Sequence, residues 1–164
     1  MRITEAEIHS ITRRFFVKNG FTVVSRTPTG QEIHYRLSID ESKYKIPDLV
    51  CFKNSKIIVL EQKIEYNKLF SGLDCDVNKI NSFLNNDAAV SEFLLLMKEF
   101  EINFDKDSIV GGFSSLFPKN SKHVLDSNRI QTAVEIDGTH CTINLLQDSG
   151  LSQYFPFKSL DLVI

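Results

Sequence analysis

Asp48, Glu61 and Lys63 are the residues whose types and spacing most directly indicate chemistry. If the two carboxylates face each other they repel, and the pKa of one rises unless a cation lies between them. Mg²⁺ or Mn²⁺ is the expected cation, because hard divalent ions prefer oxygen ligands. A lysine beside such an ion holds a phosphate oxygen or orients water, so the trio indicates metal-assisted phosphodiester hydrolysis.

Two apolar runs position these residues. The runs over 48–52 and 56–60 flank Asn54 and Ser55, which are turn-forming residues. Because each run has the length of a strand and lacks a helical period, we expect a β-hairpin whose strands are buried.

The loop length decides which side chains meet. A two-residue loop places Asp48 opposite Glu61, with Cβ atoms about 4.5–5.5 Å apart on one face. Lys63 shares that face, because alternate residues of a strand point the same way. A four-residue loop gives the same register, whereas an odd-length loop places Leu60 or Gln62 opposite Asp48.

A simpler interpretation of this cluster is that it is merely solvated. Charged residues often end strands, and a surface pair such as Glu61 and Lys63 contributes little to stability. The residues over 57–60 are all apolar, however, so these two charges extend a buried strand. We therefore favour the functional interpretation.

Other segments predict further elements. Thr4 and Glu7 form a capping-box pattern, which predicts a helix over 5–18. We also expect strands over 21–25 and 33–40, with a turn at 28–30 between them, and a helix over 74–86. The apolar run over 93–97 is expected to be a buried strand, with a short helix as the alternative, because periodicity does not distinguish the two.

The remainder of the chain favours β-structure. Asp137-Gly138 predicts a type I′ turn between strands over 132–136 and 139–146. Gly111-Gly112 is interpreted as a loop or hinge. The order of elements predicts an α/β or α+β sandwich.

The stretch from Pro47-Asp48 to Glu61-Gln62-Lys63 resembles the PD-(D/E)XK nuclease superfamily. Within it, the stretch is most similar to the Holliday-junction resolvase branch and to small restriction-type nucleases. The resemblance implies a restriction-endonuclease-like αβββαβ core over 1–97. It also implies that Asp48 and Glu61 are metal ligands and that Lys63 is the catalytic cation.

The resemblance implies further ligands and has two departures. Relatives carry an acidic residue on the first helix, for which Glu7 fits and Glu5 is the alternative, and the backbone carbonyl of Gln62 is a further candidate ligand. The chain is not basic as the resolvases are. Residues 98–164 have no counterpart and are expected to form a β-rich C-terminal extension of a single domain over 1–164.

Several other polar residues have two interpretations. Arg13, Arg14 and Lys18 form either a basic helical face for phosphates or a solvated face. Lys79 either reaches a phosphate or simply lies on a helix, next to Asp74 and Asp76, which complement its dipole. The histidines are interpreted as mostly structural: His9, His34, His123 and His140.

Composition sets outer limits on the class of protein. The chain has 164 residues, of which 42% are hydrophobic and 24% charged, as expected for one globular domain. No apolar run is long enough for a membrane span, and the N-terminus lacks the apolar region of a secretory signal. The three cysteines are too few and too scattered for a disulfide framework, Cys51 is expected to be core, and a cytoplasmic location fits.

Together these patterns predict a Mg²⁺- or Mn²⁺-dependent endonuclease that acts on nucleic acid, with DNA as the expected substrate, in restriction, repair, recombination or phage defence. The alternative is a catalytically inactive nucleic-acid-binding or assembly module with the same fold, and an RNase of that fold is a third interpretation. We consider a homodimer or a larger defence or repair complex as the assembly. Tyr154, Phe155 and Phe157 either offer an aromatic surface for it or pack in the core of the C-terminal segment.

Overall fold

A computed structural model describes residues 3–24, 37–38, 44–45, 47–72, 75–98, 104–116 and 128–163. Within these ranges the α-helices are α1 (Glu5–Lys18), α2 (Asp76–Leu84) and α3 (Asp87–Met97). The larger sheet contains β1 (Thr22–Val23), β4 (Leu49–Lys53), β5 (Lys56–Glu65), β6 (Ile109–Leu116), β7 (Ile130–Asp137), β8 (His140–Asp148) and β9 (Ser159–Val163). Two short strands, β2 (Leu37–Ser38) and β3 (Tyr44–Lys45), pair separately.

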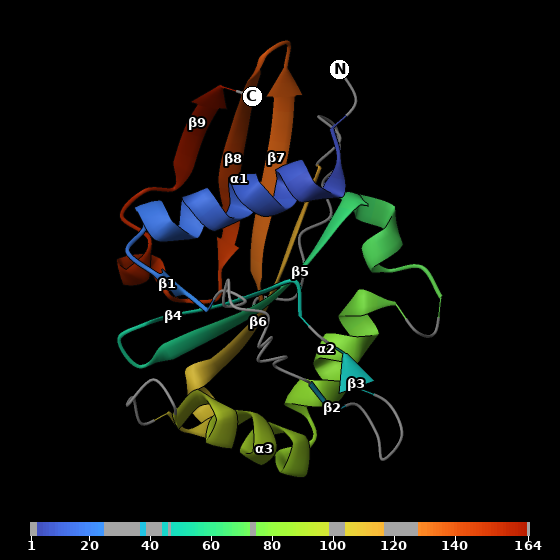
Figure 1. The fold of residues 1–164 in the computed structure, drawn as a ribbon, viewed down its shortest axis with the longest axis vertical. Coiled ribbons are helices and arrows are strands. Elements are labelled where there is room, and N and C mark those ends of the chain that lie inside the picture. Colours follow the sequence, from blue (N-terminus) through green and yellow to red (C-terminus); the bar gives the residue numbers. More distant parts are fainter. Residues whose placement is uncertain are drawn as a thin grey trace, which may run out of the picture.

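The protein has a mixed α/β fold built on the seven-stranded sheet, in the order β1-β4-β5-β6-β7-β8-β9 (Figure 1). Strands β1, β4 and β5 are antiparallel neighbours, β5, β6 and β7 run parallel, and β7, β8 and β9 are again antiparallel. The sheet thus continues without interruption from the hairpin strands into the C-terminal half of the chain.

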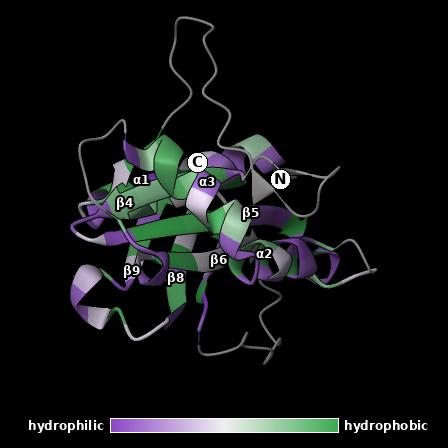
Figure 2. Cartoon of the chain, turned by 90° about the horizontal axis from the view of Figure 1, so that it is seen from below, coloured by the Kyte–Doolittle hydropathy of each residue, from purple (hydrophilic) through white to green (hydrophobic). Residues whose placement is uncertain are grey.

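Helices cover both faces of the sheet. One core cluster joins the buried side of α1 to one face, and a second joins α2 and α3 to the other. Figure 1 shows α1 crossing the C-terminal strands, whereas α2 and α3 lie at the other end of the molecule. Figure 2 shows both hydrophobic and hydrophilic stretches along α2 and α3, as expected for helices with one buried side.

Helix α1 begins and ends where the sequence predicts. The Glu7 backbone N–H donates to Thr4 Oγ1 at 3.3 Å, and the Thr4 backbone N–H donates to Glu7 Oε2 at 2.7 Å, which confirms the capping box. The apolar side chains Ile8, Ile11 and Phe15 recur at helical spacing and are buried against the sheet.

The predicted hairpin is confirmed with its register. Lys53 pairs with Lys56, and Leu49 pairs with Leu60 at the other end of the ladder. The loop is tight because Asn54 adopts a left-handed conformation with φ of 52°, which asparagine tolerates better than most residues.

Other predicted elements are matched in part. Strand β1 lies within the predicted 21–25 strand, and α2 lies within the predicted 74–86 helix. Of the predicted 33–40 strand, only β2 falls in the described ranges. The turn at 28–30, and residues His34, Asp74 and His123, lie outside them.

The predicted strand over 93–97 is wrong, because this segment is part of α3. The Asn86 side chain accepts a hydrogen bond from the Ala89 backbone N–H at 3.1 Å and so caps the helix start. Phe93 packs edge to face on Phe83 of α2, whereas Leu95 is 60% exposed. One buried side, rather than continuous burial, is what a packed helix requires.

The interpretation of Gly111-Gly112 as a loop or hinge is also wrong, since both glycines lie inside β6. A Cβ at Gly111 would lie 2.7 Å from Ile80 Cγ2 of α2, and one at Gly112 would lie 3.0 Å from the Ile130 carbonyl oxygen. The glycines therefore allow α2 and β7 to approach the strand closely. Strand β6 follows the helices and runs parallel to β5.

The C-terminal hairpin is confirmed, with its loop shifted by one residue. Asp137 pairs with His140, so the loop residues are Gly138 and Thr139, and Gly138 has φ of 63°. No helix in the described part of the chain is both long and apolar enough to span a membrane.

The C-terminal aromatic residues divide between core and surface. Phe155 is 1% exposed and stacks on Phe15 with ring centroids 6.2 Å apart. Phe157 is 45% exposed, with Lys18 Nζ 5.0 Å from its ring centroid. Phe155 is therefore part of the core under α1 and contributes no surface for association. Cys51 is likewise fully buried in β4, and burial raises the pKa of its thiol.

We predict that Phe155→Ala lowers the free energy of unfolding by about 3–5 kcal/mol, because it leaves a cavity between α1 and the sheet. The matched variant Phe157→Ala should change it by less than about 1 kcal/mol, since this ring is half exposed. Urea unfolding of both variants measures the difference, and equal effects would contradict the assignment of Phe155 to the core.

Candidate functional site

Asp48 lies immediately before β4, where the hairpin ladder ends. Leu49 pairs with Leu60, so the next position in the register is Asp48 opposite Glu61. Asp48 Oδ2 accepts a hydrogen bond from the Gln62 backbone N–H at 2.8 Å. The carboxylate thus occupies the edge of β5 that β4 no longer covers.

Glu61 is the most buried charged residue of the cluster, with an exposure of 0%. Its backbone lies in the middle of the sheet, where it pairs with Phe113 of β6. Val59, two residues earlier, belongs to the core cluster under α2, so Glu61 points to that same face. An ionised carboxylate at this depth is costly unless other charges or polar groups compensate it.

Lys63 is on the same face as Glu61, and its side chain is 31% exposed. Its Nζ lies 3.6 Å from Oδ2 of Asp76, a carboxylate in the first turn of α2 that is 7% exposed. The ion pair fixes the direction of the Lys63 side chain, because the Asp76 side chain is enclosed by its surroundings.

Gln62 points to the opposite face, toward α1. Its Oε1 lies 3.0 Å from His9 Nδ1, which identifies this ring nitrogen as the donor. Gln62 is only 6% exposed, and its Nε2 has no hydrogen-bond partner among the described residues. The amide therefore offers a buried donor next to the edge of the strand.

These side chains border a cleft of about 160 Å³ between the start of α1 and the strands. From the predicted site the cleft is lined by Asp48, Gln62 and Lys63, and α1 adds Glu5 and His9. The structure thus brings three of the predicted residues to one cleft. Glu61 lies beneath it and does not line it.

The acidic residue that α1 contributes to the cleft is Glu5. Glu7 instead faces back to Thr4, whose backbone N–H and hydroxyl both donate to Glu7 Oε2. These two hydrogen bonds lower the pKa of Glu7. Of the two alternatives from the sequence, Glu5 lines the cleft and Glu7 caps the helix.

The basic residues predicted to contact nucleic acid do not line this cleft. Arg13 and Arg14 are exposed on α1. Burial raises the pKa of Cys141 in β8, and the nearby Arg14 guanidinium opposes this effect in part. Lys79 is half-buried on α2, one turn after Asp76.

Sequence reasoning set aside two residues that contact the predicted site. His9 follows Glu5 by one helical turn, so the shared helix face was visible in the sequence. Asp76 was interpreted only as a favourable charge at a helix start. Its contact with Lys63 arises from the packing of α2 on the sheet, for which the sequence carries no local signal.

Within the described ranges, no three His, Cys, Asp or Glu side chains come together as a ready-made metal-binding group. Comparisons with family models, with curated proteins and with solved structures found no match to this chain. The function must therefore be argued from the site itself.

We predict that Asp48→Ala lowers the free energy of unfolding by about 1–2 kcal/mol, because the Gln62 N–H loses its acceptor. Asp48→Asn should stay within about 1 kcal/mol of wild type, since the amide oxygen still accepts this bond and one of two facing carboxylates is removed. Urea unfolding in EDTA measures both. Two equally destabilised variants would mean that the charge, rather than the hydrogen bond, stabilises this end of the hairpin.

The lowered pKa of Glu7 predicts a pH dependence. Its ionised form stabilises the folded state fully above the unfolded-state value, near 4.5, and this contribution is lost as the pH falls through the lower folded-state value. The stability advantage of wild type over Glu7→Gln, which keeps a capping side chain, should therefore shrink on acidification. Urea unfolding at pH values from about 7 down to about 3 tests this, and a difference independent of pH would contradict it.

Proposed function

We propose that this protein is a metal-dependent endonuclease that hydrolyses phosphodiester bonds, with DNA as the expected substrate. The observation that carries the proposal is the hairpin register, in which Leu49 pairs with Leu60. Asp48 and Glu61 occupy the next positions beyond this pair, and Lys63 follows Glu61 on the same face of β5. Two carboxylates and one ammonium group at this spacing match the requirements of phosphodiester hydrolysis.

The topology supports a restriction-endonuclease-like core. The chain order α1-β1-β4-β5-α2-β6 is an αβββαβ order once the separate β2–β3 pair and the added helix α3 are set aside. Its four strands are neighbours in the order β1-β4-β5-β6. The last strand of this core is β6, from the part of the sequence expected to be an extension.

The donor chemistry fits a hard divalent cation. Asp48 and Glu61 offer carboxylates from neighbouring strands, and the Gln62 backbone carbonyl is the third candidate ligand. When bound, Mg²⁺ or Mn²⁺ supplies a Lewis acid for the phosphodiester oxygen.

The chain's own residues supply the other requirements. Lys63 donates a hydrogen bond to a phosphate oxygen and stabilises the charge that develops there. Asp76 is a positioning residue that orients Lys63 through the 3.6 Å ion pair. The Gln62 Nε2 group is a further donor for a ligand oxygen at the strand edge.

The Lys63–Asp76 pair also favours the second candidate, an inactive nucleic-acid-binding or assembly module, because a lysine paired with a buried carboxylate is held away from substrate. Thermal unfolding with divalent ions discriminates the two. A stabilisation by Mg²⁺ or Mn²⁺ that Asp48→Ala abolishes favours the enzyme, and no stabilisation by either ion favours the module. Offering DNA and RNA to the protein separates a DNase from an RNase.

We predict that Lys63→Ala lowers the rate of Mg²⁺-dependent cleavage by about 100-fold or more. It should also lower the melting temperature, because it removes the ion pair to the buried Asp76 carboxylate, so cleavage is compared well below the unfolding transition of the variant. The matched control is Lys106→Ala, which removes another lysine paired with an aspartate, Asp87, at an exposed site. The control should cleave at the wild-type rate. Gel assays of both variants test this, and near-normal cleavage by Lys63→Ala would remove this residue from the proposed site.

A further inference from the structure

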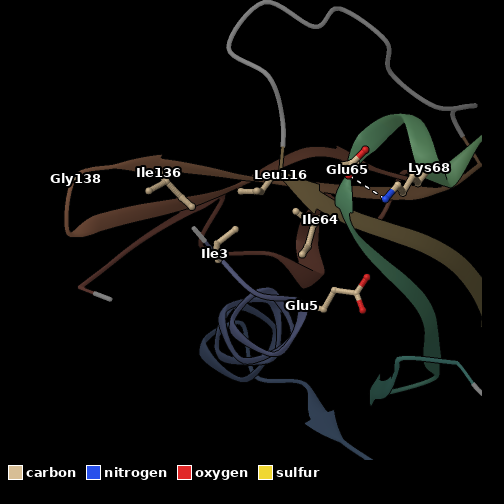
Figure 3. Close-up of a pocket in the computed structure, with 8 residues that line it drawn as sticks. All are labelled: Ile3, Glu5, Ile64, Glu65, Lys68, Leu116, Ile136 and Gly138. Atoms are coloured by element: carbon tan, nitrogen blue, oxygen red, sulfur yellow. Dashed lines mark ion pairs between the residues drawn. The ribbon is translucent and has the colours of Figure 1, made fainter. Parts of the chain in front are cut away.

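A larger pocket, of about 670 Å³, lies beside the candidate cleft. Its volume falls in the range of about 300–1,000 Å³ that is typical of small-molecule sites. Figure 3 shows its apolar lining between the start of α1 and the strands β5, β6 and β7. The apolar lining consists of the side chains of Ile3, Ile64, Leu116 and Ile136.

The pocket lies at the carboxyl ends of three parallel strands. Ile64 is near the end of β5, Leu116 ends β6, and Ile136 is near the end of β7. This edge of a parallel sheet is where ligands commonly bind in α/β proteins. The location therefore favours ligand binding over a packing defect.

An irregularity in β5 joins the pocket to the candidate cleft. Lys63 pairs with Ser115 and Glu65 pairs with Leu116, so the register shifts at Ile64. Such bulges re-aim side chains and are common next to active sites. As a result, the residue that directly follows Lys63 forms part of the pocket wall.

Glu5 also joins the two cavities, because it lines both. A polymer held at Lys63 by one phosphate would bring its next chemical group to Glu5 and into the pocket. The occupant is therefore expected to be a part of the same substrate, adjacent to the phosphate.

The charge of the pocket decides which part of the substrate enters. Glu65 forms an exposed ion pair with Lys68 at 2.9 Å, and Glu5 adds a further carboxylate. The charged residues that line the pocket within the described ranges are thus net negative, which disfavours a phosphate there. A neutral ring with apolar faces and amino hydrogens fits the aliphatic wall and the acceptor oxygens of the rim.

We propose that this pocket binds one unpaired, amino-bearing nucleobase of a nucleic acid strand, next to the phosphodiester at Lys63. The inference rests on the proposed function and gives its substrate class: single-stranded or locally unpaired nucleic acid. A paired base cannot enter, because its amino group is occupied and its release from the stack costs a few kcal/mol.

The first test measures binding to wild-type protein in EDTA, so that cleavage plays no part. The probes are fluorescein-labelled oligonucleotides of equal length: single-stranded oligo-dC, its abasic counterpart, and the duplex of dC with dG. Anisotropy should show oligo-dC binding about tenfold or more tightly than either of the others, since a bound base contributes substantially to affinity. Equal affinity for the abasic strand or for the duplex would overturn the proposal.

The second test locates the contact. Ile136→Gln replaces part of the apolar wall and should weaken oligo-dC binding about fivefold or more. The control Leu146→Gln makes the same kind of change on β8, at a side chain that is 38% exposed and does not line the pocket. It should bind as wild type does. Equal binding by both variants, with melting temperatures that show folding, would place the contact elsewhere and overturn the proposal.

The third test concerns the amino group. Wild type should prefer oligo-dC over oligo-dT, and Glu5→Gln should remove most of this preference, because an amide both donates and accepts. No preference in wild type would overturn the role of the rim. Base-dependent binding without any Mg²⁺-dependent cleavage would support the base-binding pocket and overturn the proposed nuclease function. Mg²⁺-dependent cleavage with base-independent binding would support the nuclease function and overturn the base-binding pocket.

Discussion

The register of the β4–β5 hairpin is the constraint on which the candidate site depends. Because side chains alternate along a strand, a slip of one residue would move Glu61 and Lys63 to the α1 face and bring Gln62 to the α2 face. The tight loop at Asn54, with φ of 52°, sets this register. The apolar residues of both strands maintain it, since each fills one of the two cores.

The same alternation distributes the site over two helices. Lys63 points to the α2 face and meets Asp76, and Gln62 points to the α1 face and meets His9. Asp48 lies between them and accepts a bond from the uncovered edge of β5. The cleft therefore forms where β5 continues past Leu60, the residue opposite the start of β4. There the uncovered edge of β5 meets the start of α1.

Buried carboxylates set this region apart from the apolar packing elsewhere in the fold. Glu61 and Asp76 are almost fully buried carboxylates, and burial of such groups is unfavourable without compensation. The aromatic cluster around Phe155 and the close approach of α2 to Gly111 provide dense apolar packing elsewhere. A local departure from an apolar interior, supported by regular packing around it, is typical of functional sites.

Much of this arrangement follows from local patterns that the sequence carries by itself. The capping box of α1, the tight loop at Asn54 and the alternation along β5 act between near neighbours in the chain. They were therefore sufficient to predict α1 and the hairpin with its register. The aromatic residues of the C-terminus, by contrast, had equal claims to surface and core until Phe155 was found against Phe15.

Only the tertiary structure decided the segments whose local sequence is compatible with more than one secondary structure. The apolar run of α3 has no distinctive period, and its capping by Asn86 and packing on Phe83 select a helix. Gly111 is of a type common in turns, yet it lies inside β6. Glycine is needed there because Ile80 of α2 leaves no room for a Cβ. The pairing of Lys63 with Asp76 likewise depends on how α2 packs on the sheet, since contacts between distant segments leave no periodic trace in the sequence.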